Sequence, residues 1–131
     1  RWIAWVTSPN AAAPMADGTL VHQVTQSRLA IYDVAAGTIR DAGSPRFDLE
    51  PGTPLWTPDS ARLLFSTGRR VYSDLHAYDV AASRYVALTK DRTLQLGSQS
   101  RDGSVVAVVM STPETPGEVY VTDAGASAFR P

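Results

Sequence analysis

An internal repeat with a period of about 44 residues runs through this sequence and leaves few folds open to it. A first marker is an aspartate that follows Tyr or Thr and precedes small residues; it occurs at Asp33, Asp79 and Asp123, which are 46 and 44 residues apart. A second marker is an aspartate followed by Gly or Ser, and it occurs at Asp17, Asp59 and Asp102. Because two independent markers recur at nearly the same interval, the sequence indicates a unit of structure that is repeated three times.

Each unit divides into four short strands separated by tight turns. Asp, Gly and Ser favour turns, and Val, Thr and Tyr favour half-buried strands, whereas Glu and Lys, which usually fill exposed helix faces, total four residues. The predicted strands are 1–6 (as the opening strand), 19–24, 29–32 and 38–40, then 54–56, 62–66, 75–78 and 84–88, then 96–98, 105–110, 118–122 and a segment cut short at Phe129. Hairpin loops are expected at 25–28, 67–73 and 111–117.

Several of these strands are apolar on both faces. Residues 105–110 are continuously apolar and residues 2–6 nearly so, whereas a strand with one face in water would alternate. We therefore predict an all-β fold, a partial β-propeller of about three four-stranded antiparallel blades at about 1–42, 43–90 and 91–131, the last one truncated. A β-sandwich of about seven strands is the alternative, but sandwiches do not normally repeat a turn marker at this interval.

The overall composition excludes several classes of function. The 13 acidic and 12 basic residues give a formal net charge of −1, so we expect no nucleic acid and no membrane as partners, because both need a basic excess. Apolar runs stay far below the roughly 18–20 residues that cross a bilayer, and the start does not resemble a signal peptide. Because Cys is absent, disulfides and thiolate sites are excluded, and a bacterial cytoplasm and a periplasm are both compatible with the sequence.

The conspicuous histidines, aspartates and tryptophans have structural interpretations. His22 and His76 lack the further ligands that a metal site needs. The marker aspartates recur in every unit and are predicted to cap turns, and Trp2, Trp5 and Trp56 are predicted to pack between blades. We therefore predict no catalytic residue, no cofactor and no metal in this chain.

Candidate contacts with a substrate or partner are confined to two loops. Arg69 and Arg70 lie in the longest loop of the second unit and could recognise a carboxylate. Glu114 lies in the proline-rich loop 111–117, which could face a partner domain. A solvated loop is the competing interpretation for Arg69 and Arg70.

The turn segments resemble the repeats of TolB-like propellers. Residues 57–65 and 100–106 resemble the Ser-Pro-Asp-Gly turn of those repeats and the apolar strand after it, and residues 86–89 resemble their closing Leu-Thr strand end. Residues 115–123, Thr-Pro-Gly-Glu-Val-Tyr-Val-Thr-Asp, together with the ending Phe-Arg-Pro, are similar to a segment of bacterial prolyl oligopeptidase-family serine peptidases, the dipeptidyl and acylaminoacyl peptidase relatives. The resemblance covers nearly the whole chain and is weakest over 7–16.

The peptidase resemblance implies a non-catalytic role for this chain. In such peptidases a propeller precedes an α/β-hydrolase domain with a Ser-Asp-His triad, and it covers the active site and restricts entry to short peptides. The expected partners are therefore that domain of the same parent chain and a peptide substrate. No Gly-x-Ser-x-Gly elbow occurs in the sequence, and Glu50, Glu114 and Glu118 are too scattered to match the paired glutamates of dipeptidyl peptidases. The alternative is a free-standing TolB-like propeller that acts as a protein- or peptide-binding module.

Three blades are fewer than the roughly four to eight with which propellers close. Because the chain begins at Arg1 and ends at Pro131 within a strand pattern, we expect a piece of a longer protein. Two sheet faces would then be open, and stacked repeats depend on neighbours to cover their faces. We expect the chain to associate with other copies through these faces or to be poorly stable alone.

Overall fold

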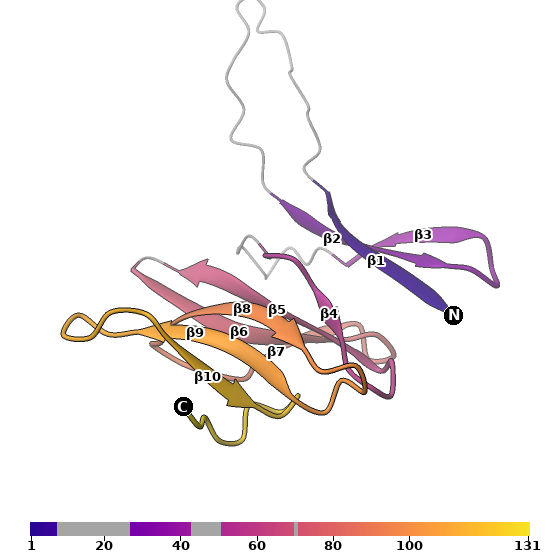
Figure 1. The fold of residues 1–131 in the computed structure, drawn as a ribbon. Helices are drawn as coiled ribbons and strands as arrows, with labels where there is room; N and C mark the ends of the chain where they lie inside the picture. Colours follow the sequence, from indigo (N-terminus) through magenta and orange to yellow (C-terminus); the bar gives the residue numbers. More distant parts are fainter. Residues whose placement is uncertain (8–26, 43–50, 70) are drawn as a thin grey trace, which may run out of the picture.

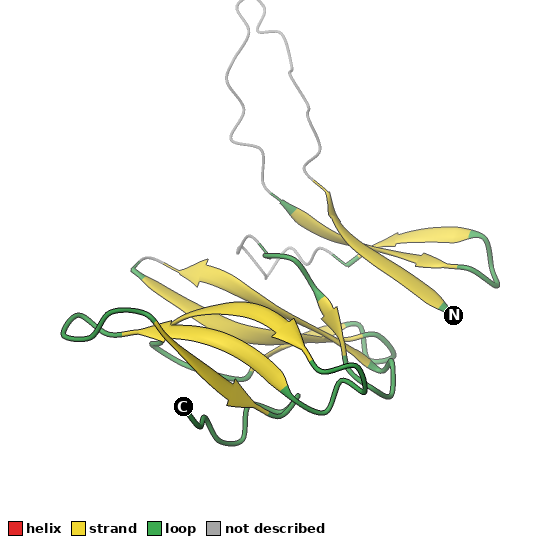
Figure 2. Ribbon diagram, in the orientation of Figure 1, coloured by secondary structure: helices red, strands yellow, loops and turns green. Residues whose placement is uncertain are grey.

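The computed structural model describes residues 1–7, 27–42, 51–69 and 71–131 (Figure 1). These ranges consist of strands, turns and loops without a helix (Figure 2), which confirms the all-β prediction. Consequently they contain no helix that could span a bilayer. The strands are β1 (Trp2–Thr7), β2 (Arg28–Asp33), β3 (Thr38–Asp41), β4 (Leu55–Trp56), β5 (Arg62–Arg69), β6 (Tyr72–Asp79), β7 (Arg84–Ala87), β8 (Thr93–Gln99), β9 (Val106–Ser111) and β10 (Glu118–Thr122).

The second repeat forms a complete four-stranded blade. Strands β4, β5, β6 and β7 pair antiparallel in sequence order. The third repeat pairs β8, β9 and β10 in the same way, and an isolated bridge between Val121 and Arg130 begins a further strand beside β10. A single parallel bridge, Ser73 to Thr93, joins β6 to β8, so the seven-stranded sheet consists of two blades in contact.

The first repeat forms a separate sheet in the order β1-β2-β3. Trp2 pairs with Asp33, just as Arg62 pairs with Asp79 in the second blade. Strand β1 therefore occupies the position of a blade's second strand, and the prediction that residues 1–6 form the opening strand is wrong. The whole length of β1 pairs with β2, so no strand fits between them.

Strand β1 lies at the edge of the described sheet. Trp2 and Ala4 on one face pack against the core between the first and second blades, whereas Ile3 on the other face is 54% exposed. The described residues therefore cover only one face of the apolar run Trp-Ile-Ala-Trp-Val. The predicted strand 19–24, the turn at Asp17 and His22 lie outside the described residues.

The central strand β5 buries alternate side chains against two neighbouring sheets. Leu63 and Phe65 contact the first sheet, whereas Leu64 contacts the third blade. The buried residues between the first and second blades are Leu29, Ile31, Ala42, Leu63, Phe65, Tyr78 and Val80. Those between the second and third blades are Leu64, Ala77, Val106 and Val108. The second blade is thus covered on both faces, as the sequence predicts for a propeller.

The outermost faces carry exposed apolar side chains instead. Val119 lies four residues before its repeat aspartate, as Leu75 does in the second blade; Leu75 is 0% exposed, and Val119 is 64% exposed. Ile3 in β1 corresponds in register to Leu63, and their exposures are 54% and 0%. The same position is therefore buried where a described blade covers it and exposed where none does.

The five marker aspartates that the structure describes cap turns, as predicted. Asp102 Oδ1 accepts hydrogen bonds from Ser100 Oγ (2.6 Å) and from Ser104 N (3.1 Å), and these bonds lower the pKa of Asp102 to about 2. Hydrogen bonds to Asp59 and Asp123 lower their pKa values as well. Backbone N–H groups of the following turn are also capped by Asp33 and Asp79.

The turns of successive blades also touch each other. Gly103 has φ +71°, a left-handed conformation that glycine adopts without strain, and a Cβ there would lie 3.0 Å from Cγ of Pro58. The Asp-Gly turn of the third blade therefore packs directly on the Pro-Asp turn of the second.

Candidate functional site

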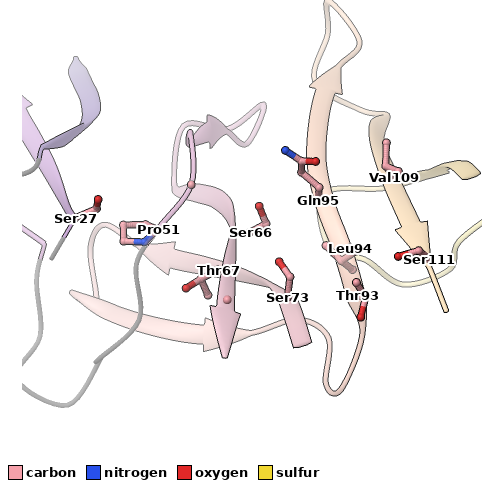
Figure 3. Close-up of a pocket in the computed structure, with 12 residues that line it drawn as sticks. Ser27, Pro51, Ser66, Thr67, Ser73, Thr93, Leu94, Gln95, Val109 and Ser111 are labelled. Atoms are coloured by element: carbon pink, nitrogen blue, oxygen red, sulfur yellow. The ribbon is translucent and has the colours of Figure 1, made fainter. Parts of the chain in front are cut away.

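A polar hollow lies where the β5–β6 hairpin meets the start of β8 and the end of β9 (Figure 3). Its volume of about 530 Å³ falls within the range of small-molecule sites. Figure 3 shows Ser66, Thr67 and Ser73 between Pro51 on one side and the β8–β9 pair on the other. The lining residues are Ser27, Pro51, Gly52, Ser66, Thr67, Gly68, Ser73, Thr93, Leu94, Gln95, Val109 and Ser111.

Two connecting segments form the walls of the hollow beside this hairpin. Gly52 N donates to Ser66 O at 2.8 Å, and Ser73 N donates to Arg92 O at 2.8 Å. A Cβ at Gly52 would lie 3.1 Å from Ser66 O, so glycine allows this close approach of the two backbones without a shift.

A buried carboxylate fixes the second of these segments. Asp74 is 7% exposed, and its Oδ1 accepts hydrogen bonds from Thr89 Oγ1 (2.8 Å) and Arg92 N (3.1 Å). Its Oδ2 accepts a bond from Asp91 N at 3.1 Å, and Leu75 N donates to Thr89 Oγ1 at 2.9 Å. The connection from β7 to β8 is therefore held to the start of β6, which fixes where Thr93 enters the hollow.

The chemistry of the hollow is uncharged and rich in hydrogen-bonding groups. Its side chains offer hydroxyl groups and the amide of Gln95, which can donate and accept. Thr67 is 2% exposed, and its Oγ1 has no hydrogen-bond partner. A buried polar group without a partner is costly, so a polar ligand atom that reached Thr67 would gain a bond that the described chain does not supply.

Strand β8 adds backbone groups to the same site. Successive residues of a strand direct their N–H and C=O groups to opposite edges. Beyond the single bridge at Thr93, β8 pairs with β9 on one edge only among the described strands. Beyond Thr93, its other edge has no described strand paired with it.

Two of the predicted contact residues, Arg69 and Glu114, lie near this end of the blades. Arg69 ends β5 and pairs with Tyr72 across the hairpin, and Arg70 lies outside the described residues. Most of the expected loop 67–73 is strand, which corrects that boundary. Glu114 is exposed in the loop after Ser111, and its N–H donates to Thr112 Oγ1 at 3.3 Å. Contact of the three with a substrate stays a prediction.

The polar residues that line the hollow were not found from the sequence. Ser66, Thr67 and Ser73 fall at strand ends beside an expected loop, where Ser and Thr are common. The available signal was the run of small polar residues at the ends of β5 and β6, but only pairing between blades shows that they converge with Gln95.

His76, Trp2 and Trp56 lie in packed surroundings. The ring of His76 stacks on Phe65 with centroids 6.2 Å apart, which suits a packing role. Trp2 and Trp56 pack against the core between the first and second blades. Within the described ranges there is no group of three residues that could hold a metal ion.

Comparison with protein-family models and with curated proteins finds no match. The described architecture is that of a partial β-propeller. Among solved structures, TolB from Acinetobacter baumannii is similar, with a TM-score of 0.61 and 18% identity over 86% of this chain and 29% of the TolB chain. The chain thus spans less than a third of that protein. At this identity the likeness shows the fold alone: the chain has a TolB-like propeller fold.

Proposed function

We propose that this chain is the non-catalytic propeller part of a prolyl oligopeptidase-family serine peptidase, where it scaffolds a hydrolase domain and admits peptides to it. The observation that carries the proposal is the uncharged hollow between the second and third blades. An extended peptide presents neutral N–H and C=O groups at regular intervals, and hydroxyl groups, an amide and a strand edge can pair with them.

The segment that resembles these peptidases also fits the proposal. Residues 118–122 form β10, and the preceding loop holds Pro113, Glu114 and Pro116. The loop starts at Ser111, one of the residues of the hollow. A partner domain seated on this end would therefore lie beside the proposed peptide path.

The first test concerns the parent protein. The complete product of the reading frame that encodes this chain is treated with a fluorophosphonate probe, which labels activated serines. We expect labelling at a Gly-x-Ser-x-Gly serine after the propeller, with Asp and His further on. A complete product with no labelled serine and no such elbow would reject the peptidase assignment.

The second test concerns the hollow. Gln95→Leu in the intact protein removes hydrogen-bonding groups from an exposed position of β8. We expect kcat/KM to change for peptides long enough to reach the hollow and to stay constant for a chromogenic dipeptide. Thr38→Val, a similar change at an exposed position of β3, is the matched control. Equal effects of both variants on all substrates would contradict the role of the hollow.

A second candidate function is a free-standing TolB-like propeller that binds a protein or a peptide. The TolB-like fold is compatible with it. Under this function the complete product ends after its last blade, is not labelled by the serine probe, and still binds peptides in a way that Gln95→Leu weakens. The labelling result thus separates the two candidates.

A further inference from the structure

A second hollow lies between the β7–β8 connection and the outer part of the third blade. Its volume is about 560 Å³, and it shares no lining residue with the uncharged hollow. Unlike the first hollow, it combines cations with apolar side chains. Its lining residues are Leu88, Thr89, Lys90, Arg92, Met110, Tyr120, Ala126, Ser127, Ala128 and Phe129.

The two cations have no ionic partner in the described part of the chain. Lys90 and Arg92 are exposed, and neither side chain has a hydrogen bond or an ion pair with a described residue. Asp91 stands between them with φ +56° and is not among the residues that line the hollow. The positive charge of the hollow is therefore not neutralised from within it.

The backbone that carries the cations is held in place. Asp74 accepts hydrogen bonds from Asp91 N and Arg92 N, and the hydroxyl of Thr89 donates to the same carboxylate. The buried carboxylate of Asp74 is therefore paired with donors of the connection itself and not with the side chains of Lys90 and Arg92. A ligand that binds Lys90 and Arg92 does not have to order the connection first, which lowers the entropic cost of binding.

Apolar side chains line the rest of the hollow. Leu88, Tyr120 and Phe129 are partly buried and pack against the core between the second and third blades, and Met110 is half-buried beside them. Tyr120 donates its hydroxyl to Glu118 at 3.3 Å, and Glu118 does not line the hollow. An apolar group of a ligand would thus rest on an existing surface.

We propose that this hollow binds an acidic peptide segment in which a carboxylate side chain stands next to a large apolar one. The carboxylate pairs with the guanidinium of Arg92, whose planar donors suit two oxygens, and with Lys90. The apolar side chain lies against Phe129 and Met110. Two cations on a chain of net charge −1 do not suit a polyanion, because nucleic-acid binding needs a broad basic surface.

The test is direct binding to the intact protein that contains this chain, followed by fluorescence anisotropy. The probe is a labelled acetyl-Asp-Phe-Asp-Leu-amide peptide, and its matched control has Asn in place of both Asp residues. We expect Lys90→Gln and Arg92→Gln each to weaken binding about two- to fivefold, as for exposed charge pairs, and the double variant about tenfold. Binding should also weaken as salt screens the charges.

Arg101→Gln is the matched control variant, since Arg101 is an exposed arginine of the same blade outside the hollow. We expect it to bind the acidic peptide as the unchanged chain does. Circular dichroism confirms that each variant is folded. Equal affinity for the Asn peptide, an equal loss with Arg101→Gln, no binding of the Asp peptide at millimolar concentration, or a preference for polyphosphate over the peptide would overturn the proposal.

Discussion

Two valine-to-alanine substitutions in the third blade give the sharpest test of its open face. Val106 in β9 is 0% exposed and packs against the second blade. Replacing it with Ala removes two methyl groups, about 0.8 kcal/mol each in transfer free energy, and leaves a cavity. The expected total loss in the free energy of unfolding is about 2–3 kcal/mol. Val119 is 64% exposed, so only about a third of its surface is buried. Val119→Ala should therefore lower the free energy of unfolding by about 0.5 kcal/mol.

The assay is urea denaturation followed by circular dichroism, at the lowest protein concentration that gives a signal. An unchanged m value shows that each variant alters stability and not the surface exposed on unfolding. The chemical change is identical in the two variants, so the difference between their losses in free energy of unfolding measures how far a neighbouring blade covers each valine. Equal costs for Val106→Ala and Val119→Ala would refute the assignment of the Val119 face as open.

Protein concentration extends the same test to self-association. We propose that copies of the chain stack through their open faces, as blades stack within the chain. The cost of Val119→Ala should then rise with concentration while that of Val106→Ala stays constant, and sedimentation velocity should show a larger species. A monodisperse monomer with a sharp, high unfolding transition would contradict this association.

Three further predictions concern the turns and the link between blades. Asp74→Ala should lower the free energy of unfolding by about 2 kcal/mol or more, because it removes a buried carboxylate that accepts three hydrogen bonds; a loss below 0.5 kcal/mol in urea denaturation would show that the link is dispensable. Gly37→Ala, at φ +67° with open space around it, should cost about 1 kcal/mol, and Gly103→Ala should cost more because its Cβ would meet Pro58; the reverse order would contradict the contact between turns. The pKa of Asp102 is lowered from 3.8 to about 2 in the folded chain, so its contribution to stability is complete above about pH 4 and is lost as the pH falls through 2. Unfolding measured between pH 5 and 2 should therefore depend less on pH in Asp102→Ala, and an unchanged slope would argue against the cap.

Most of the strands could be predicted from the sequence because turn markers and apolar runs are local signals. The strand predicted at 84–88, after the marker at Asp79, is β7, and the continuous apolar run 105–110 predicts β9 to within one residue. The position of β1 was not predictable in this way. Its apolar residues predict a strand, but its partner depends on pairing across residues 8–26, which sequence spacing does not reveal.

The candidate hollow shows the same limit. Ser66, Ser73 and Gln95 are ordinary polar residues at strand ends, and each would be read as a solvated position by itself. They line one hollow because the second and third blades pack together and are bridged at Ser73. No local pattern encodes that convergence.

The sequence by itself determined the repeat, the all-β class and the aspartate-capped turns, since these depend on contacts within a few residues. Only the tertiary structure decided which face each strand covers and which polar groups meet. Leu75 and Val119 occupy the same register position in their repeats, yet one is buried and the other exposed. The physical reason is that burial in a stacked sheet is supplied by the neighbouring blade and not by the strand's own residues.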